Sequence, residues 1–216
     1  SGTSWTTLSI PSGNFFYDGT NTYTATGDYG SIYRSTNNGL NWVNYRQSVY
    51  DGYCNEVDAV DDYTAFIACD DGIILKTVNG GLNWVILHDP QMNYIHTLHF
   101  FNSMTGYIAG LSIGNNGNIK KTTDGGLNWL NSNSQILSQV YKLSFPTTAT
   151  GYAATKYGTL GKTTDSGLNW NMLGPYDPFS TGGLYFINNN TGYWAGGSNN
   201  SNKHIRKTTN GGLNWQ

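Results

Sequence analysis

The sequence predicts an all-β fold, a five-bladed β-propeller of four-stranded antiparallel blades, and three observations predict it. A segment that ends in Trp occurs five times, with 42, 45, 41 and 45 residues between successive Trp residues, and such a period is typical of propeller blades or helical arrays. Each copy holds several Gly and its apolar residues alternate, which excludes helical repeats. Each repeat also has room for four short strands and tight turns, the meander of a propeller blade.

The repeated segment itself predicts a strand followed by a tight turn. Its copies are Gly30–Trp42, Gly72–Trp84, Gly117–Trp129, Gly158–Trp170 and Lys203–Trp215. An Asp or Asn accepts hydrogen bonds from backbone N–H groups two residues on, as in an Asx-turn, a Gly takes positive φ, and the Trp covers the turn. We call the stretch from this Asp or Asn to the Trp the corner. The Asx and Trp pairs are Asn37 and Trp42, Asn79 and Trp84, Asp124 and Trp129, Asp165 and Trp170, and Asn210 and Trp215. Every residue type in the corner has a structural role.

The chain divides into five units within one domain, residues 1–216. The units cover residues 12–48, 49–90, 91–135, 136–174 and 175–216. In unit 4 the predicted strands are Val140–Phe145, Gly151–Thr155 and Thr159–Thr163, with a fourth that opens at Trp170. Gly2–Trp5 copies the end of a corner and the strand-like Thr6–Ile10 follows it. Residues 1–10 are therefore expected to complete the last blade and close the ring. The competing interpretation is an excerpt of a longer propeller.

Composition excludes several classes of protein. The chain has 216 residues and a formal net charge of −2, which gives no overall attraction to nucleic acid or anionic lipid. Its 16 Tyr, 8 Phe and 7 Trp argue against disorder. No apolar run approaches the roughly 20 residues that span a bilayer. Ser1–Ser4 lacks the basic and apolar regions of a signal peptide, so any such peptide is expected to have been removed.

The corner motif, [ST]-x-[DN]-x-Gly-x-x-Trp, resembles the Asp-box or BNR repeat of sialidase-like propellers. The longer pattern adds Gly-Tyr-x-Ala, at Gly106–Ala109 and Gly151–Ala154, before Gly-x-[Ile/Leu]-x-Lys-Thr-Thr. This form is most similar to the Ycf48/Hcf136-like repeats of photosystem assembly factors. The resemblance covers the whole chain and implies a propeller whose corners are structural. Three of the five corners have Asn where the motif has Asp, which preserves the hydrogen-bond geometry.

The residue inventory argues against an enzyme. A sialidase needs an Arg cluster and a Tyr–Glu pair, whereas this chain has three Arg, of which Arg34 belongs to the repeat, and one Glu, Glu56. Seven acids gather in unit 2: Asp51, Glu56, Asp58, Asp61, Asp62, Asp70 and Asp71. They allow a hydrolytic pair or a Ca²⁺ site, and a solvated acidic patch is favoured over both. His96 and His99 lie on opposite faces of a strand. We expect no catalytic residue, no metal ligand and no cofactor.

Two sets of residues are candidates for binding. One cation per unit precedes the corner, and together these would form a basic ring for an acidic partner or anionic glycan, or else cover apolar surface with their stems: Arg34, Lys76, Lys121, Lys162 and Lys207. Aromatic residues in or near the segments that vary most between units suit sugar faces or protein hot spots: Tyr50, Tyr53, Tyr94, Tyr176, Phe179 and Trp194. Trp194 is also interpreted as a filler between blades.

Cys54 and Cys69 are candidates for a disulfide. If Asp61 and Asp62 form a two-residue hairpin turn, the two cysteines lie opposite each other across the hairpin. A Cys pair and the sequons at Asn189 and Asn199 are compatible with an extracellular or periplasmic location. The sequence thus predicts an exported, non-catalytic scaffold that binds a protein partner, either a monomer or a module of a larger protein. A lectin-like propeller is the alternative, and a fragment related to glycoside hydrolases ranks third.

Overall fold

The computed structural model describes residues 15–17, 23–26, 32–37, 39–44, 50–134, 136, 138–175, 181–197 and 203–216. All regular secondary structure in these residues is β. Unit 1 holds β1 (Phe15–Tyr17), β2 (Tyr23–Thr26), β3 (Ile32–Ser35) and β4 (Val43–Asn44). Unit 2 holds β5 (Cys54–Ala59), β6 (Ala65–Cys69), β7 (Ile73–Thr77) and β8 (Val85–His88). Unit 3 holds β9 (Met92–Phe100), β10 (Gly106–Ser112), β11 (Gly117–Thr122), β12 (Leu130–Asn131) and β13 (Asn133–Ser134). Unit 4 holds β14 (Val140–Ser144), β15 (Gly151–Thr155), β16 (Thr159–Thr163) and β17 (Asn169–Pro175), and unit 5 holds β18 (Thr181–Phe186), β19 (Gly192–Gly197) and β20 (Lys203–Thr208).

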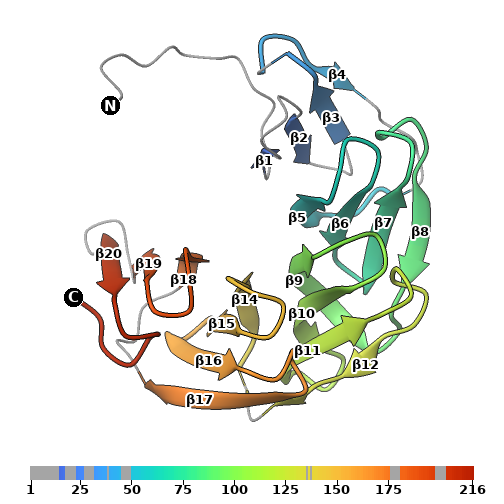
Figure 1. Cartoon of the computed structure of the whole chain (residues 1–216). Coiled ribbons are helices and arrows are strands. Elements are labelled where there is room, and N and C mark those ends of the chain that lie inside the picture. The colour runs from blue at the N-terminus through green and yellow to red at the C-terminus, as the bar shows by residue number, and fades with distance from the viewer. Residues whose placement is uncertain are drawn as a thin grey trace.

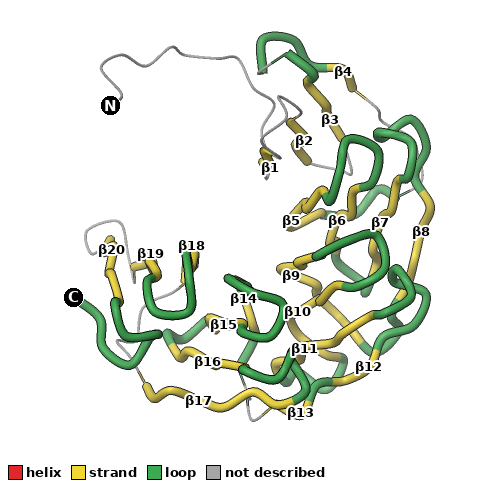
Figure 2. The backbone as a smooth tube through the Cα atoms, viewed as in Figure 1, coloured by secondary structure: helices red, strands yellow, loops and turns green. Residues whose placement is uncertain are grey.

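The strands form one antiparallel meander per unit, and the five sheets follow one another along an arc in chain order (Figure 1). The first strand of each unit lies on the inside of the arc and the later strands lie progressively further out (Figure 2). In unit 4 the strands begin and end within one residue of the predicted ranges. The short β13 pairs in parallel with β17, so the segment that leaves unit 3 also joins the sheet of unit 4.

A meander places its turns alternately at two ends of the sheet, and both ends are recognisable here. At the first end, the corners of units 2 to 5 bond to the turn between the first two strands, as in Gly80 N–H to Tyr63 O and Gly125 N–H to Met104 O, both 2.8 Å. We call this the corner end. The opposite end, which we call the loop end, carries the turns between the second and third strands and the links between units. There, Lys156 N–H donates to Gln139 O at 2.8 Å.

Ring closure by residues 1–10 falls outside the described residues. The described residues do include the start of an outer strand in unit 5, where Gln216 and Lys207 exchange two backbone hydrogen bonds of 2.9 Å. The corresponding pair in unit 2 is Val85 with Lys76. Gln216 therefore already occupies the first position of an outer strand in the last sheet.

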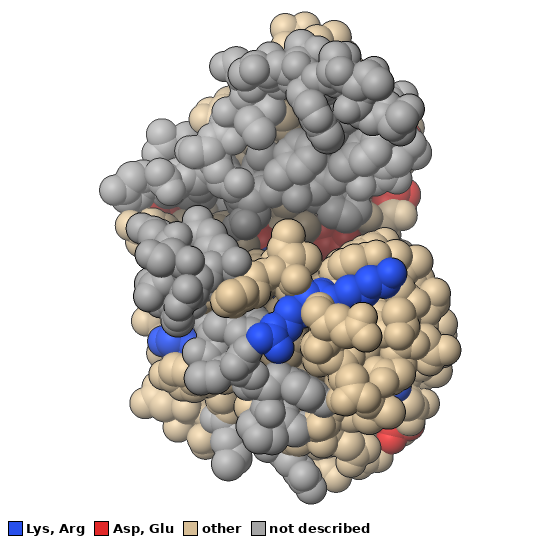
Figure 3. Space-filling view, turned by 90° about the vertical axis from the view of Figure 1, so that its left-hand side faces the viewer, with Lys and Arg blue, Asp and Glu red and all other residues tan. Residues whose placement is uncertain are grey.

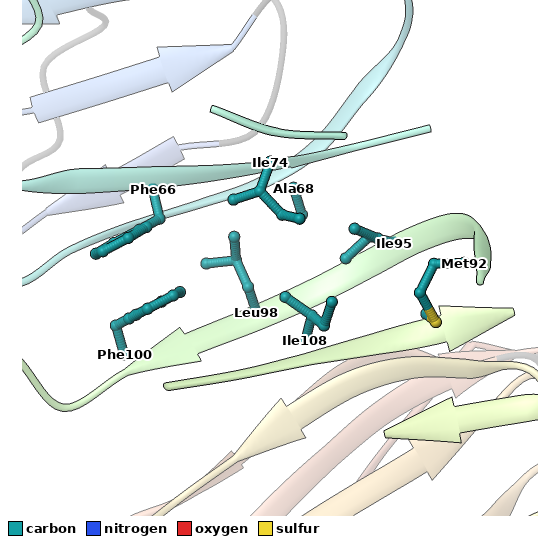
Figure 4. Packing of buried hydrophobic residues seen from close by; sticks show 8 residues of the cluster. All are labelled: Phe66, Ala68, Ile74, Met92, Ile95, Leu98, Phe100 and Ile108. Atoms are coloured by element: carbon teal, nitrogen blue, oxygen red, sulfur yellow. The ribbon is translucent and has the colours of Figure 1, made fainter. Parts of the chain in front are cut away.

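The hydrophobic core lies between units, not within them. In the cluster of Figure 4, Phe66, Ala68 and Ile74 of unit 2 face Met92, Ile95, Leu98, Phe100 and Ile108 of unit 3, and all are buried. The Phe66 and Phe100 rings stack with centroids 3.5 Å apart. Burial of apolar surface at such contacts is the main force that joins one sheet to the next. We call the side of a unit that faces the following unit its forward face.

Cys54 and Cys69 are joined by a disulfide, although the pairing behind the sequence argument differs in detail. Val60 N–H donates to Thr64 O at 3.0 Å, so the hairpin turn has three residues and not two. This longer turn offsets the pairing by one residue, and a bulge between Cys54 and Glu56 corrects the offset. The two changes cancel, and Cys54 again lies opposite Cys69.

Candidate functional site

The corners are closed hydrogen-bond networks. In unit 2, Thr77 Oγ1 accepts the N–H of Gly81 at 3.0 Å and donates to Asn79 Oδ1 at 3.0 Å. Asn79 Oδ1 also accepts the N–H of Asn83 at 2.9 Å, and Trp84 Nε1 donates to Gly81 O at 3.1 Å. The bonds of the Ser or Thr hydroxyl and of the Asx oxygen recur in the other four corners. The indole bond recurs in unit 1, where Trp42 Nε1 donates to Gly39 O at 3.1 Å, whereas the buried Nε1 atoms of Trp129, Trp170 and Trp215 have no hydrogen-bond partner among the described residues. Asn and Asp serve equally because the acceptor is one oxygen.

The two Asp corners gain one further bond. Asn128 Nδ2 donates to Asp124 Oδ2 at 2.8 Å, and Asn169 Nδ2 donates to Asp165 Oδ2 at 2.7 Å. Hydrogen bonds from the Asn128 side chain and backbone lower the pKa of Asp124, and those from the Asn169 backbone and side chain lower the pKa of Asp165. Both carboxylates are therefore held by donors within their own corner.

Thr122→Val is expected to lower the free energy of unfolding by about 1–3 kcal/mol, because it leaves the N–H of Gly126 without its acceptor in a buried site. Thr122 is buried while its neighbour Thr123 is exposed, so Thr123→Val is a matched control. Urea unfolding measures both. An equal, small effect of the two substitutions would contradict the structural role of this hydroxyl.

The cations predicted to form a basic ring link each unit to the next corner. Arg34 of unit 1 donates to Gly80 O at 2.8 Å and Asp62 O at 3.0 Å. Lys76 of unit 2 donates to Gly125 O at 3.0 Å and Lys121 of unit 3 to Ser166 O at 3.1 Å. Lys162 Nζ lies beside Gly211, 2.9 Å from where a Cβ would be. Three of these cations thus donate to backbone carbonyls of the next unit, and Lys162 lies beside the next corner. A basic ring for an anionic partner stays a prediction.

Aromatic rings complete these links. The Lys76 ammonium lies over the Phe66 ring and that of Lys162 over the Tyr152 ring, at 5.1 and 5.2 Å. Tyr152 also donates its hydroxyl to Asn189 O of unit 5 at 2.7 Å. In units 2 to 5 the residue paired with the cation across the sheet is aromatic. In unit 1 that residue is Thr24, and the cation is Arg34. Its planar group donates to two carbonyls at once.

Lys121→Met is expected to cost about 1 kcal/mol of stability, since it removes a charge-assisted hydrogen bond to Ser166 O while retaining most of the apolar stem. Lys207→Met is the matched control, because Lys207 holds the same position in unit 5 and is exposed. We expect that control to leave the urea midpoint unchanged. If both variants behave alike, the carbonyl contact does not contribute.

Trp194, a candidate for binding, is part of the core instead. It is fully buried in a cluster with Leu160, Leu184 and Phe186. Its indole N–H donates to Thr181 Oγ1 at 3.2 Å. The large ring therefore fills the space between units 4 and 5 and is inaccessible to a ligand.

The acids of unit 2 are dispersed along its hairpin. Asp61 accepts the N–H groups of Tyr63 and Thr64 in the turn at the corner end, at 2.8 and 2.7 Å. Asp70 accepts from Asn55 Nδ2 at 2.8 Å near the loop end. In the part of the chain that the structure describes, no group of three or more His, Cys, Asp or Glu side chains is arranged to hold a metal ion.

Glu56 and Asp58 do form a polar group on the inner strands. Both face β9, where Glu56 Oε2 accepts the N–H of Leu98 at 3.2 Å and Asp58 Oδ2 accepts that of Phe100 at 2.7 Å. Lys142 of β14 reaches past β9 to form an ion pair with Glu56. This pair joins units 2 and 4 across the inside of the arc, a contact that no local pattern in the sequence indicates.

Burial perturbs the titration of two groups here. Desolvation raises the pKa of Asp58 to about 7. The hydrogen bond from Phe100 N–H opposes this rise, and the charge of Glu56 adds to it. Burial lowers the pKa of His99 to about 4. His99 Nδ1 lies 3.6 Å from Asp58 Oδ2, and its ring stacks on Phe145 at 5.3 Å. At neutral pH His99 is therefore uncharged.

The aromatic residues predicted for binding fall into three groups. Tyr50 is half-buried, and its hydroxyl donates to Asp70 O at 3.1 Å; burial and the charges of Asp71 and Asp70 raise its pKa to about 12. Tyr53 and Tyr94 are exposed at the loop end. Tyr176 and Phe179 lie outside the described residues. Of the six candidates, the structure thus brings Tyr50, Tyr53 and Tyr94 to one end of the sheets.

A cavity of about 300 Å³ opens at the same end, between units 3 and 4. Its lining residues are Leu111, Asn115, Ser138, Gln139, Lys156 and Tyr157. The Lys156 ammonium lies over the Tyr157 ring at 5.6 Å, and Gln139 Nε2 contacts His96 Nε2. His96 stacks on Tyr94 at 5.9 Å and meets the edge of Tyr141 at 4.9 Å. The cavity and the exposed Tyr94 are therefore joined by a continuous row of polar and aromatic side chains.

Sequence reasoning missed the lining of this cavity. Lys156 and Tyr157 lie at the tip of the turn between β15 and β16, in the gap that the sequence leaves between the predicted strands Gly151–Thr155 and Thr159–Thr163. The signal that would have found them is their place in the meander. That turn shares an end with the inter-unit links, so an aromatic residue at its tip lies near Tyr94.

Comparison with known proteins shows the fold. No protein-family profile and no curated protein sequence matches the chain. Two Ycf48 structures match with TM-scores of 0.67: one bound to a D1 peptide, at 14% identity over 94% of this chain and 80% of that one, and one from Cyanidioschyzon merolae, at 15% identity over 90% and 68%. An ancestral GH74 enzyme matches with a TM-score of 0.73, at 20% identity over 100% of this chain and 32% of that one. GH74 of Niastella koreensis matches at 0.73 and 15% identity over 97% and 38%. The chain is thus an all-β protein of the β-propeller kind, and it spans about a third of these enzymes' length.

Proposed function

We propose that the chain is a non-catalytic scaffold that binds a protein partner, in the form of an extended peptide segment, at its loop end. The observation that carries the proposal is the cavity between units 3 and 4 with Tyr94 beside it. Exposed aromatic rings beside a concave, mixed polar and apolar surface are typical of protein hot spots. That one neighbour of similar fold has been solved with a bound peptide is consistent with this use of the fold.

The arrangement favours a protein over a glycan. The exposed aromatic residues of the loop end come from unlike places: Tyr53 from the segment that enters unit 2, Tyr94 from an inner strand, and Tyr157 from a turn. A lectin-like propeller with near-equivalent sites would present the same set in several units. The repeated residues occur instead in the corners and the core, where they bond to the protein itself.

Peptides selected on the chain from a phage-displayed library are expected to lose about tenfold or more in affinity with Tyr157→Ala and with Tyr94→Ala, the loss typical of an aromatic hot spot. Tyr63→Ala is the matched control, because Tyr63 and Tyr157 are both 66% exposed but Tyr63 lies at the corner end. An equal loss with Tyr63→Ala, or multivalent binding to one sugar class on a glycan array, would contradict the proposal.

A second candidate function is hydrolysis of a glycan, and one observation favours it. Burial raises the pKa of Asp58 to about 7, beside the ion pair of Glu56 with Lys142, and a carboxyl group that keeps its proton near neutral pH is what general acid catalysis uses. Turnover of chromogenic glycosides that is lost with Asp58→Asn but retained with Asp61→Ala would establish it. No turnover of any such glycoside is the result expected of a binding scaffold.

An exported location, extracellular or periplasmic, is part of the proposal, because a disulfide joins Cys54 and Cys69 and disulfides persist in oxidising compartments. We also propose a monomer or a module of a larger protein. The finer prediction for the fold, five blades with the ring closed by residues 1–10, stays a prediction.

A further inference from the structure

The forward faces of units 2, 3 and 4 are buried with the same kinds of residue at the same positions, and unit 1 shares the aliphatic position. In units 2, 3 and 4 an aromatic ring, an Ala and an aliphatic side chain are fully buried against the following unit: Phe66, Ala68 and Ile74; Tyr107, Ala109 and Ile119; and Tyr152, Ala154 and Leu160. In unit 1 the aliphatic residue is Ile32, which packs on Val57 and Ile67 of unit 2. Each forward face thus requires a neighbouring sheet.

Unit 5 carries the same face, but there it is open. The sheet pairing aligns Tyr193, Ala195 and Ile205 with Tyr152, Ala154 and Leu160. Ile205 is 78% exposed and Tyr193 is 38% exposed, whereas Leu160 and Tyr152 are fully buried. Tyr185, in the place of the buried Ser144 and Asp58, is 66% exposed. Figure 3 looks at this side of the molecule, where Lys and Arg side chains cross a mainly uncharged surface.

The open face of unit 5 also carries the cation and the aromatic ring that form the polar contacts of the other interfaces. Lys207 occupies the position of Lys162, and its ammonium lies over the Tyr193 ring at 5.9 Å. In unit 4 the equivalent pair, Tyr152 and Lys162, reaches the corner end of unit 5. Unit 5 therefore presents both the apolar residues and the Lys over an aromatic ring that units 2, 3 and 4 use to contact the next unit.

We propose that the forward face of unit 5 is an interface for one more sheet of the same repeat. Such a sheet would bury Ile205 and Tyr193 beneath its own apolar face and offer a corner carbonyl to Lys207. Three interfaces in this chain already join such a forward face to the next sheet of the repeat, and a fourth buries Ile32 of unit 1 in the same way. Two copies of the face would bring Lys207 side chains together without a carbonyl acceptor, which disfavours self-pairing.

The first unit of the same chain is the competing occupant. Units 1 and 5 lie at the two ends of the arc (Figure 1). Units 1 and 5 could meet only if the interfaces between successive units shifted. Those interfaces are packed, and they are linked by the contacts of Arg34, Lys76, Lys121 and Lys162. Close-packed interfaces resist such continuous deformation. We therefore place a separate sheet, and not unit 1, on this face.

The test compares the 216-residue chain with an extended chain that carries a second copy of residues 175–216 after Gln216. Urea unfolding and light scattering are measured for both, each with and without Ile205→Asp. In the 216-residue chain we expect a monomer whose urea midpoint Ile205→Asp leaves unchanged. In the extended chain we expect a higher midpoint, which Ile205→Asp returns to that of the 216-residue chain. Ile113→Asp, at a 69% exposed residue of the loop end, is the control and should shift neither.

Three results would overturn the proposal. A lower midpoint with Ile205→Asp in the monomeric 216-residue chain would mean that the chain's own first unit covers the face. An oligomer that Ile205→Asp dissociates would mean that a second copy does. An extended chain with an unchanged midpoint, insensitive to Ile205→Asp, would mean that the face does not accept a sheet of this repeat.

Discussion

Replacement of Lys120 by Met is expected to lower the free energy of unfolding by about 3–5 kcal/mol, the range found when one partner of a buried ion pair is removed. Lys120 is buried on β11, and its ammonium lies 2.8 and 2.6 Å from the two carboxylate oxygens of Asp89. Gln91 Oε1 accepts its third proton at 2.8 Å. Met fills the space of the stem but leaves the buried carboxylate of Asp89 without its counter-ion.

Two further variants make this result specific. Lys121→Met changes the adjacent residue on the same strand and is expected to cost only about 1 kcal/mol. Lys120→Met combined with Asp89→Asn removes both charges and keeps an oxygen for the N–H of Gln91, which Asp89 accepts at 2.9 Å. The double variant should recover much of the loss in urea unfolding. If the double variant is no more stable than Lys120→Met, the loss does not come from an uncompensated charge.

The second large effect is a pH dependence that originates at Asp58. Its pKa is raised from 3.8 to about 7 in the folded protein, a shift that corresponds to about 4 kcal/mol. Between these two pH values the folded state holds a proton that the unfolded state has lost. The contribution of Asp58 to stability is therefore full below about pH 4, falls as the pH rises towards 7, and is constant above that.

Asp58→Asn is expected to remove this dependence, since Asn Oδ1 still accepts the N–H of Phe100 but carries no charge. The stability of the variant relative to the wild type should rise by about 4 kcal/mol between pH 4 and pH 8. His99 acts in the opposite direction, because its lowered pKa makes the stability of the folded protein rise from about pH 4 to 6.5. The stability of the wild type therefore varies less with pH than the contribution of Asp58 or of His99 alone. Urea unfolding of both proteins across this range measures the difference. A difference that does not vary with pH would contradict burial of an ionisable Asp58.

Much of the fold could be predicted because its information is local and repeated. The short apolar run Gly151–Thr155 and the segment Thr159–Thr163 after it mark two strands, and Asp165–Gly167 marks the turn after them, at the positions that the structure shows. The residue types of the corner also mark the Asx oxygen as an acceptor of backbone N–H groups. The N–H that it accepts, however, lies four residues on, as from Asn128 to Asp124, and not two. Repetition then carries the same solution to all five units.

The functional surfaces were less predictable because they depend on contacts between units. Lys121 was recognised as one of a set, but nothing in its own sequence shows that Ser166 O, 45 residues on, accepts its proton. Lys142 and Glu56 meet across β9 although 86 residues separate them. Trp194 replaces the Ile108 or Ala153 of its sister units, and only the packing with Leu160 and Leu184 shows that it fills the core. The cavity at Gln139 and Lys156 likewise arises where two units meet.

The central claim is that the two ends of the sheets have different roles. The corner end holds the sheets together, and the loop end binds the partner. Hydrogen–deuterium exchange of the chain with and without a library-selected peptide tests it most directly. The account predicts new protection at residues 50–53, 92–96, 111–116, 138–141 and 156–158, with none added at the corners. Protection confined to residues 79–84, 124–129, 165–170 and 210–215 would contradict it.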